Sequence, residues 1–201
     1  MKVLILGGFL GSGKTTALMQ LARHIVDNSK SDAQNKVIIL ENEVGEVGID
    51  DMYLRSGGLQ VANLFSGCAC CTVSGELVGS LTAIDEQFAP DWVIVETTGI
   101  AYPGRIQESL KWGLNLDSSV AVVVDAKRWK RLRIPLHELL QGQIVNSAAV
   151  LINKCDLVDE QTLDEVERDI RELDENTRIY RISALEPVPA QVWSGVLGEE
   201  L

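Results

Sequence analysis

The sequence is short of basic residues and lacks long apolar runs. Its 201 residues include 18 lysines and arginines against 29 aspartates and glutamates, so the formal net charge is -11. A surface of this sign repels phosphate backbones, which argues against nucleic acid as a partner. A small polyphosphate ligand is still compatible with it, because backbone N–H groups can hold one locally. The apolar runs reach only strand length, and we therefore expect no transmembrane helix and no membrane partner.

The sequence shows no internal repeat and no low-complexity segment, and we expect no secretion signal. The apolar start at 1–6 leads into GSGKT at 11–15 and not into a small-residue cleavage site. We therefore expect a cytoplasmic protein whose four cysteines are thiols or metal ligands and not disulfides. The length predicts a single domain over 1–201, large enough to bury a core without a covalent or metal staple.

Apolar runs of strand length alternate with helical patterns along the chain. The expected strands cover 2–7, 36–40, 92–95, 120–124, 150–152 and 178–182. The expected helices cover 14–28, 76–88, 190–197 and an acidic segment with Leu163, Val166, Ile170 and Leu173 on one face. Continuous apolar strands between helices are typical of a parallel sheet covered on both faces. The sequence therefore predicts an α/β fold with a doubly wound, mostly parallel sheet in three α/β/α layers, with ligands at the carboxyl ends of the strands.

The first predicted strand leads into a glycine-rich loop and a helix. The loop fits the pattern G-x-x-x-x-G-K-[ST] in the strand–helix context that the pattern requires. Gly11, Ser12 and Gly13 would wrap around a phosphate with their N–H groups pointing inward. Lys14 would reach the β- and γ-phosphates, and the Thr15 hydroxyl would bind Mg²⁺. These features predict a P-loop NTPase fold, with Lys14 and Thr15 among the catalytic residues.

The strand expected at 92–95 is followed by an acid. Glu96 could hold Mg²⁺ through water, and the N–H of Gly99 in the next turn could sense a γ-phosphate. A lone acid at a strand end is often only part of a solvated turn. Because this one accompanies a phosphate loop, we interpret Glu96 and Gly99 as catalytic residues.

A second polar motif follows the strand expected at 150–152. In Asn153-Lys154-Cys155-Asp156, a carboxylate could accept both N–H donors on the edge of guanine, a pair that adenine lacks. Asn153 would brace the loop, the stem of Lys154 would cover the base and Asp156 would select guanine. The segment 183–185 follows the last strand, where Ser183, Ala184 and Leu185 could complete the base pocket. This motif predicts GTP over ATP.

Three cysteines, Cys68, Cys70 and Cys71, lie close together. Three thiolates leave one tetrahedral position for an acid, a histidine, water or a partner's ligand, which describes an open metal site. Sulfur ligands favour Zn²⁺, Cu(I) or Co²⁺ over Mg²⁺ and Ca²⁺. The alternative interpretation is a buried or redox-active thiol cluster. Cys155 is interpreted as a packed thiol.

The cysteines lie at the end of a stretch, 42–72, that has no clear periodicity. An irregular stretch of that length is usually functional or mobile. Glu41 and Glu46 near its start could face phosphates or a metal, or could simply be solvated. His24 and His137 lie in helical patterns and are expected to be structural.

These motifs together resemble the GTPase domain of the CobW family, which is related to the GTPases that mature urease, hydrogenase and methylmalonyl-CoA mutase. The matching segments are GGFLGSGKTT (7–16), ENEVGEVGID (41–50), SGCACC (66–71), ETTGIAYPG (96–104), VVDA (123–126) and NKCDLV (153–158). The cysteine element is the most specific of them.

The resemblance implies a P-loop GTPase that hydrolyses GTP slowly and delivers zinc or cobalt to a client protein. It adds Thr16 to the nucleotide-binding residues, and it places Glu41 and Glu46 near the metal held by the three cysteines. Members of the family typically carry a further C-terminal domain, and we expect that domain to be absent here.

Other functions are compatible with the same motifs. One is a GTP-dependent activator of a cobalamin (corrinoid) enzyme such as a methyltransferase, whose GTP turnover would respond to that enzyme and not to metal. Another is a metal-binding sensor or storage module without catalysis. A small-molecule kinase is disfavoured by the guanine motif. The expected partners are a client metalloprotein or corrinoid enzyme and a second copy of the chain in a homodimer.

Overall fold

A seven-stranded parallel sheet forms the centre of the molecule. The computed structural model describes residues 1–29, 36–41, 59–63 and 73–199. The strands lie in the order β3-β2-β4-β1-β5-β6-β7, and every neighbouring pair is parallel. They are β1 (Lys2–Gly7), β2 (Val37–Glu41), β3 (Leu59–Asn63), β4 (Trp92–Glu96), β5 (Ser118–Asp125), β6 (Ala149–Asn153) and β7 (Arg178–Arg181).

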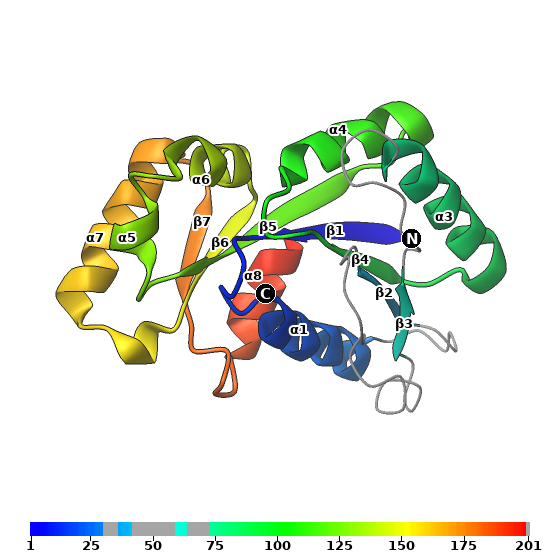
Figure 1. Ribbon diagram of the computed structural model, residues 1–201. Helices are drawn as coiled ribbons and strands as arrows, with labels where there is room; N and C mark the ends of the chain where they lie inside the picture. Colours follow the sequence, from blue (N-terminus) through cyan, green and yellow to red (C-terminus); the bar gives the residue numbers. More distant parts are fainter. Residues whose placement is uncertain (30–35, 42–58, 64–72, 200–201) are drawn as a thin grey trace.

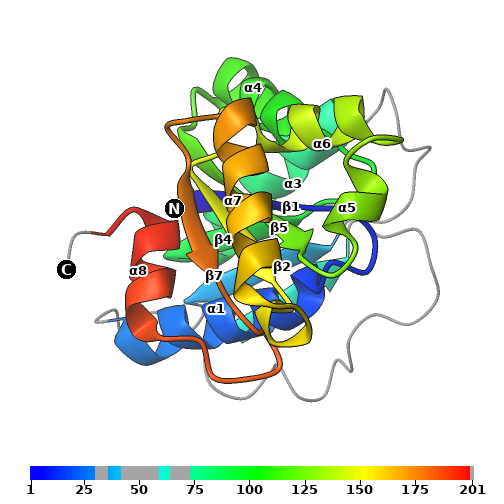
Figure 2. The same cartoon turned by 90° about the vertical axis from the view of Figure 1, so that its left-hand side faces the viewer.

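Helices cover both faces of this sheet. They are α1 (Lys14–Asn28), α3 (Val73–Phe88), α4 (Pro103–Leu114), α5 (Trp129–Leu132), α6 (His137–Ile144), α7 (Glu160–Leu173), α8 (Ala190–Leu197) and the 3-10 helix η1 (Cys155–Leu157). Figure 1 shows α1 and α8 on one face and α3, α4 and α6 on the other. The view along the β7 side in Figure 2 shows the same three layers.

The burial pattern explains why the strands read as continuous apolar runs. Along β1, Val3 and Ile5 belong to the apolar cluster shared with α3, α4, α6 and α7, whereas Leu4 and Leu6 belong to the cluster shared with α1 and α8. All five residues of β6 are buried. Because side chains on both faces of the sheet are covered by helices, polar and apolar residues do not alternate along these strands.

The predicted three-layer, doubly wound fold is confirmed. The structure places β1, α1 and α8 at the predicted residues, while β4, β5 and β6 extend one residue beyond the apolar run at their carboxyl ends. Those added residues are Glu96, Asp125 and Asn153. They join the strands because the backbone ladder pairs N–H and C=O groups whatever the side chain is.

Several elements were not expected from the sequence: β3, α4, the short helices α5 and η1, and α6, of which only the helical pattern around His137 had been noted. The stretch 42–72, expected to be irregular throughout, contains β3, which pairs with β2 at the edge of the sheet. Its five residues include Gln60 and Asn63, so no continuous apolar run indicates a strand there. The helix α4 was not expected either, because only Pro103 and Leu110 are fully buried in it. Within the described ranges, no helix is long and apolar enough to cross a membrane.

The strand order fixes the place of a ligand site. β1 lies between β4 and β5, so the carboxyl ends of those two strands flank the loop that follows β1. In the register of the sheet, Glu41 lies beside Glu96, and Asp125 lies beside Asn153. Ligands of doubly wound sheets bind at such a point, where the chain crosses from one half of the sheet to the other.

Candidate nucleotide site

The phosphate loop connects β1 to the amino end of α1. Gly13 stands at the N-cap of α1 with φ 94°, a left-handed conformation that favours glycine. A Cβ atom at this position would also collide with the side-chain amide of Asn153. Backbone N–H groups at the start of α1 have no partner within the helix, so they are directed into the loop where an anion would bind.

Lys14 and Thr15 occupy the first turn of α1. Lys14 is buried, with 8% of its surface exposed. Thr15 is exposed, and its hydroxyl donates a hydrogen bond to Oε1 of Glu96 at 2.9 Å. Glu41 lies on the next strand in register with Glu96. Hydroxyl and carboxylate oxygens are the ligands that Mg²⁺ prefers, so the pair Thr15–Glu96 fits this cation.

Asn153 joins the second motif to the phosphate loop. Its side chain is buried at the end of β6, where Nδ2 donates to the carbonyl of Ser12 at 2.8 Å. Its Oδ1 accepts from the backbone N–H groups of Lys154 at 2.8 Å and of Ala184 at 2.9 Å. One amide therefore connects three loops.

Lys154 makes a second connection to the same loop. Its Nζ donates to the carbonyl of Gly11 at 2.7 Å and lies 2.6 Å from Oδ2 of Asp125. Asp156 is exposed in η1, directly after Lys154. The backbone of Lys154 has φ 65°, so the chain turns sharply as it enters η1.

Asp125 and Arg128 belong to the site although the sequence analysis assigned neither a role; Asp125 is part of the matching segment VVDA. Arg128 donates to Asp125 through Nε at 2.7 Å and through its backbone N–H at 3.1 Å. Its Nη2 donates to the carbonyl of Leu10 at 2.5 Å, and its guanidinium lies 5.9 Å from the centre of the Phe9 ring. Both cations that pair with Asp125 thus also bind carbonyls of the phosphate loop. The sequence signal that could have indicated Asp125 is its place as an acid directly after the apolar run of β5.

The pKa of Asp125 reflects these contacts. Burial raises it, but the hydrogen bonds from Lys154 and Arg128 outweigh burial and hold the pKa of this carboxyl below its usual value of 3.8. The carboxylate is therefore the stable form in the folded protein. It keeps Lys154 and Arg128 in place against the loop.

The loop at 183–185 is fixed to α1 as well as to Asn153. Gln20 on α1 donates to the carbonyls of Ala184 at 2.8 Å and Glu186 at 2.9 Å. Ala184 is buried, whereas Leu185 is exposed by 85%. The structure therefore brings the predicted base-pocket loop to the site. The role of Gln20 was not predicted, because a polar residue on a helix gives no signal of its distant partner.

The turn after β4 lies directly against the phosphate loop. A Cβ atom at Gly99 would lie 2.6 Å from the backbone nitrogen of Leu10, so only glycine allows this approach. The backbone N–H of Thr97 donates to the carbonyl of Leu6 at 3.0 Å, which continues the ladder beyond β4. Gly99 is thus held beside the loop, as the predicted γ-phosphate contact requires.

The predicted thiophilic metal site falls largely outside the described residues. Cys68, Cys70, Cys71 and Glu46 all lie in the ranges that the structure does not describe. Among the residues that it does describe, no group of three or more His, Cys, Asp and Glu side chains could hold a metal. Cys155 packs partly buried against the core, and burial raises the pKa of its thiol.

These features together define a P-loop nucleotide-binding domain. They are a parallel sheet, a glycine-rich loop before α1, and polar side chains at the ends of β4, β5 and β6. The chain belongs to the CobW/HypB/UreG family, whose nucleotide-binding domain matches residues 2–181. It is 29% identical over 203 residues to the zinc chaperone CobW of Pseudomonas aeruginosa, an alignment covering 84% of this chain and 52% of the relative. It is 31% identical over 169 residues to the zinc chaperone YjiA of Escherichia coli, covering 79% and 50%.

Solved structures show the same fold. The Zn(II)-bound YjiA GTPase of E. coli superposes with a TM-score of 0.69 at 22% identity, covering 98% of this chain and 62% of that one. The chain spans about half the length of the curated relatives that it matches.

Proposed function

We propose that the chain binds and slowly hydrolyses GTP in order to deliver a metal, zinc or cobalt, to a client protein. The observation that carries the proposal is the buried hydrogen bond from Asn153 to the carbonyl of Ser12. It seats the guanine-selecting motif directly on the phosphate loop. Base recognition and phosphate binding would therefore act as one site.

The described residues support specific roles in nucleotide binding. Gly11, Gly13 and their neighbours Ser12 and Thr16 would enclose the phosphates with backbone N–H groups, and Lys14 would pair with the β- and γ-phosphates. The carboxylate of Asp156 would accept the two N–H donors of guanine. We propose that the loop at 183–185 completes the base pocket.

Hydrolysis would depend on the side of the site away from the guanine motif, around the end of β4. Thr15 and Glu96 would hold Mg²⁺, which when bound neutralises charge on the β- and γ-phosphates. Lys14 and the N–H of Gly99 would donate to the γ-phosphate as negative charge develops on it.

The metal is the cargo in this proposal. Cys68, Cys70 and Cys71 would bind it, with Glu41 and Glu46 as the nearby acids. Relatives named zinc chaperones support zinc as the first candidate. Three thiolates that bind metal must stay reduced, which supports action in the cytoplasm.

Two partners extend the proposal. A metalloprotein would receive the metal, and a corrinoid enzyme is the other client class. A second copy of the chain would form a homodimer at the mouth of the site, where Leu10 is exposed by 63% and Ile100 by 71%. Exposed apolar side chains of this kind are suited to a protein contact.

GTP turnover by the purified chain tests the proposal. The protein is first treated with a chelator and then titrated with Zn²⁺ or Co²⁺, beside the variant Cys70→Ser and the control Cys155→Ser. A stoichiometric effect of metal on turnover or nucleotide affinity, lost in Cys70→Ser and kept in Cys155→Ser, supports metal delivery. Turnover that ignores metal but rises with a corrinoid enzyme favours the corrinoid client. Absence of GTP turnover under all these conditions contradicts the proposal.

A further inference from the structure

A buried glutamine on α6 contacts the turn that follows Glu96. Gln143 is exposed by only 1%, and its side-chain nitrogen donates to the carbonyls of Gly99 at 3.1 Å and Ala101 at 3.0 Å. It lies outside every motif recognised in the sequence. Both hydrogens of the amide are used on this one turn.

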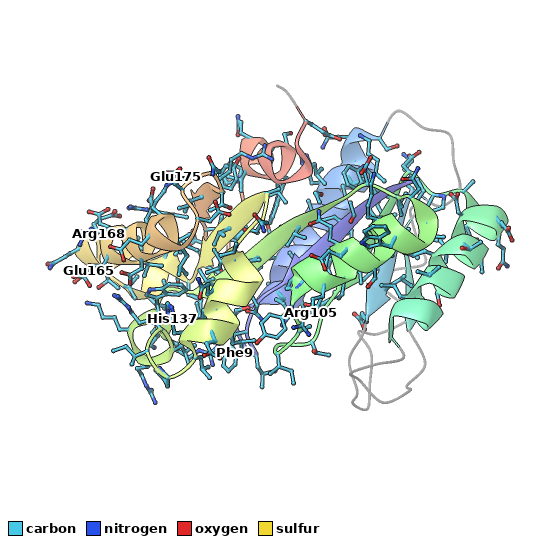
Figure 3. All side chains as sticks on the ribbon, turned by 90° about the horizontal axis from the view of Figure 1, so that it is seen from above. Phe9, Arg105, His137, Glu165, Arg168 and Glu175 are labelled. Atoms are coloured by element: carbon cyan, nitrogen blue, oxygen red, sulfur yellow. The ribbon has the colours of Figure 1, made fainter. Side chains whose placement is uncertain are left out.

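Neighbouring contacts bring α6 and the turn together. The ring of Tyr102 packs so closely on Gly142 that a Cβ atom there would collide with it. Pro103 packs in the same way against Gly7 at the end of β1. Figure 3 shows Phe9 of the phosphate loop, Arg105 of α4 and His137 of α6 along one side of the molecule. The turn is thus enclosed between β1, the phosphate loop and α6.

The contact fixes the orientation of Gly99. The N–H of Gly99 belongs to the peptide that it shares with Thr98, and the carbonyl of that peptide accepts a hydrogen bond from the backbone N–H of Ala101 at 3.1 Å. Gln143 holds the carbonyls of Gly99 and Ala101, and so it restrains the turn in which this bond is made. On its other side, Gly99 is pressed against the backbone of Leu10. Its N–H therefore has a restricted set of directions, as a preorganised donor to a γ-phosphate needs.

The amide is used here as a donor. In the part of the chain that the structure describes, no hydrogen-bond partner reaches Oε1 of Gln143, although that atom is buried. Leaving a buried acceptor without a partner costs free energy. The two bonds to the turn are thus what the side chain provides to the site.

We propose that Gln143 is a positioning residue that orients Gly99 for GTP hydrolysis, an inference that rests on the proposed function. Its amide acts through the Gly99 backbone and touches no substrate itself. Loss of the two hydrogen bonds should lower kcat and leave nucleotide binding nearly intact, because the phosphate loop and the guanine motif do not depend on them.

The test compares Gln143→Met and Gln143→Glu with the matched control Gln141→Met, an exposed position on the same helix. Methionine keeps the length and volume of the side chain but cannot donate. We expect Gln143→Met to lower kcat about tenfold, with KM for GTP and affinity for GDP changed by less than about threefold. Gln141→Met should match the wild type. Thermal unfolding of each variant checks that the fold is retained.

Gln143→Glu gives a readout that a purely structural role would not produce. A carboxylate facing two carbonyl oxygens repels them, whereas the protonated acid can donate one hydrogen bond. The kcat of this variant relative to wild type should therefore recover as pH falls.

If the wild type is active and Gln143→Met has the same kcat, the inference is overturned, while the proposed function is not affected. Equal losses in kcat and GDP affinity, or a relative kcat of Gln143→Glu that does not change with pH, also overturn it. A wild-type chain that shows no GTP turnover overturns the proposed function and the inference together.

Discussion

The two sides of the nucleotide site are built differently. On the base side, Asn153 bonds to Ser12 and Ala184 in the interior, and the carboxylate of Asp125 is buried between Lys154 and Arg128. On the hydrolytic side, the bond between Thr15 and Glu96 is exposed. Buried bonds of this kind cost much to break, whereas exposed ones exchange readily with water. The base side is therefore assembled before a ligand binds, whereas the Thr15–Glu96 pair on the hydrolytic side is available to be rearranged by one.

The largest effect of a substitution is expected at Asn153, on the base side. Asn153→Ala removes a donor to Ser12 and an acceptor for Ala184, and both backbone groups are then left in the interior. We expect the free energy of unfolding to fall by about 3 kcal/mol and GDP affinity to fall by about 100-fold. Urea denaturation and nucleotide titration measure the two effects. The exposed control Asn176→Ala should change neither, and an Asn153→Ala protein with wild-type GDP affinity would contradict the account of the base side.

Asp156 tests recognition on the base side without touching its buried bonds. Asp156→Asn replaces an acceptor with an amide N–H, which can donate to the carbonyl that xanthine has in place of the guanine amino group. We expect selectivity to shift from GTP toward XTP by about 100-fold, with stability changed by less than about 0.5 kcal/mol. Competition between the two nucleotides measures the shift. Unchanged preference for GTP would show that Asp156 does not read the base.

Thr15 tests the hydrolytic side. Thr15→Ala removes an exposed hydroxyl, so stability should change by less than about 0.5 kcal/mol. We expect kcat to fall about tenfold, and we expect the variant to need a higher Mg²⁺ concentration for half-maximal activity, because one cation ligand is lost. Steady-state turnover at several Mg²⁺ concentrations measures this, with Thr82→Ala on α3 as the control. A large loss of stability would mean that this side is as firmly built as the base side.

The smallest expected effect is that of Asp125 on how the free energy of unfolding depends on acidic pH. The pKa of Asp125 is lowered in the folded protein, so its stabilisation is fully present above the unfolded-state pKa and is lost as pH falls through the folded-state pKa, below 3.8. The Asp125→Asn variant should therefore lose less free energy of unfolding than the wild type over that acid range. Urea denaturation at stepped pH measures the difference, and the exposed Asp117→Asn serves as the control. Parallel curves for Asp125→Asn and wild type would contradict the pairing.

The sequence predicts those parts of the site whose residues are adjacent in the chain. The phosphate loop is one continuous stretch, and so is the motif from Asn153 to Asp156, so local pattern and strand context suffice to recognise them. Arg128, Gln20 and Gln143 act on backbone carbonyls of distant residues. An arginine or a glutamine on a helix has the same local pattern whether or not it has such a partner, and only the fold reveals the contact.

The same reasoning holds for the fold. Central strands such as β1 and β6 are covered on both faces, which produces the continuous apolar runs that predict them. β3 lies at the edge of the sheet and has a mixed sequence, so the run is missing. The roles of Cys68, Cys70 and Cys71 remain predictions.

Zinc affinity in two nucleotide states tests the central claim most directly. Zn²⁺ is titrated into the chain bound to a non-hydrolysable GTP analogue and into the chain bound to GDP, with Cys70→Ser as the reference for the metal motif. The account predicts affinities that differ between the two states in the wild type and are weak in both states of the variant. Equal affinities in the wild type would contradict it, because a nucleotide can drive metal release only if the two ligands are thermodynamically coupled.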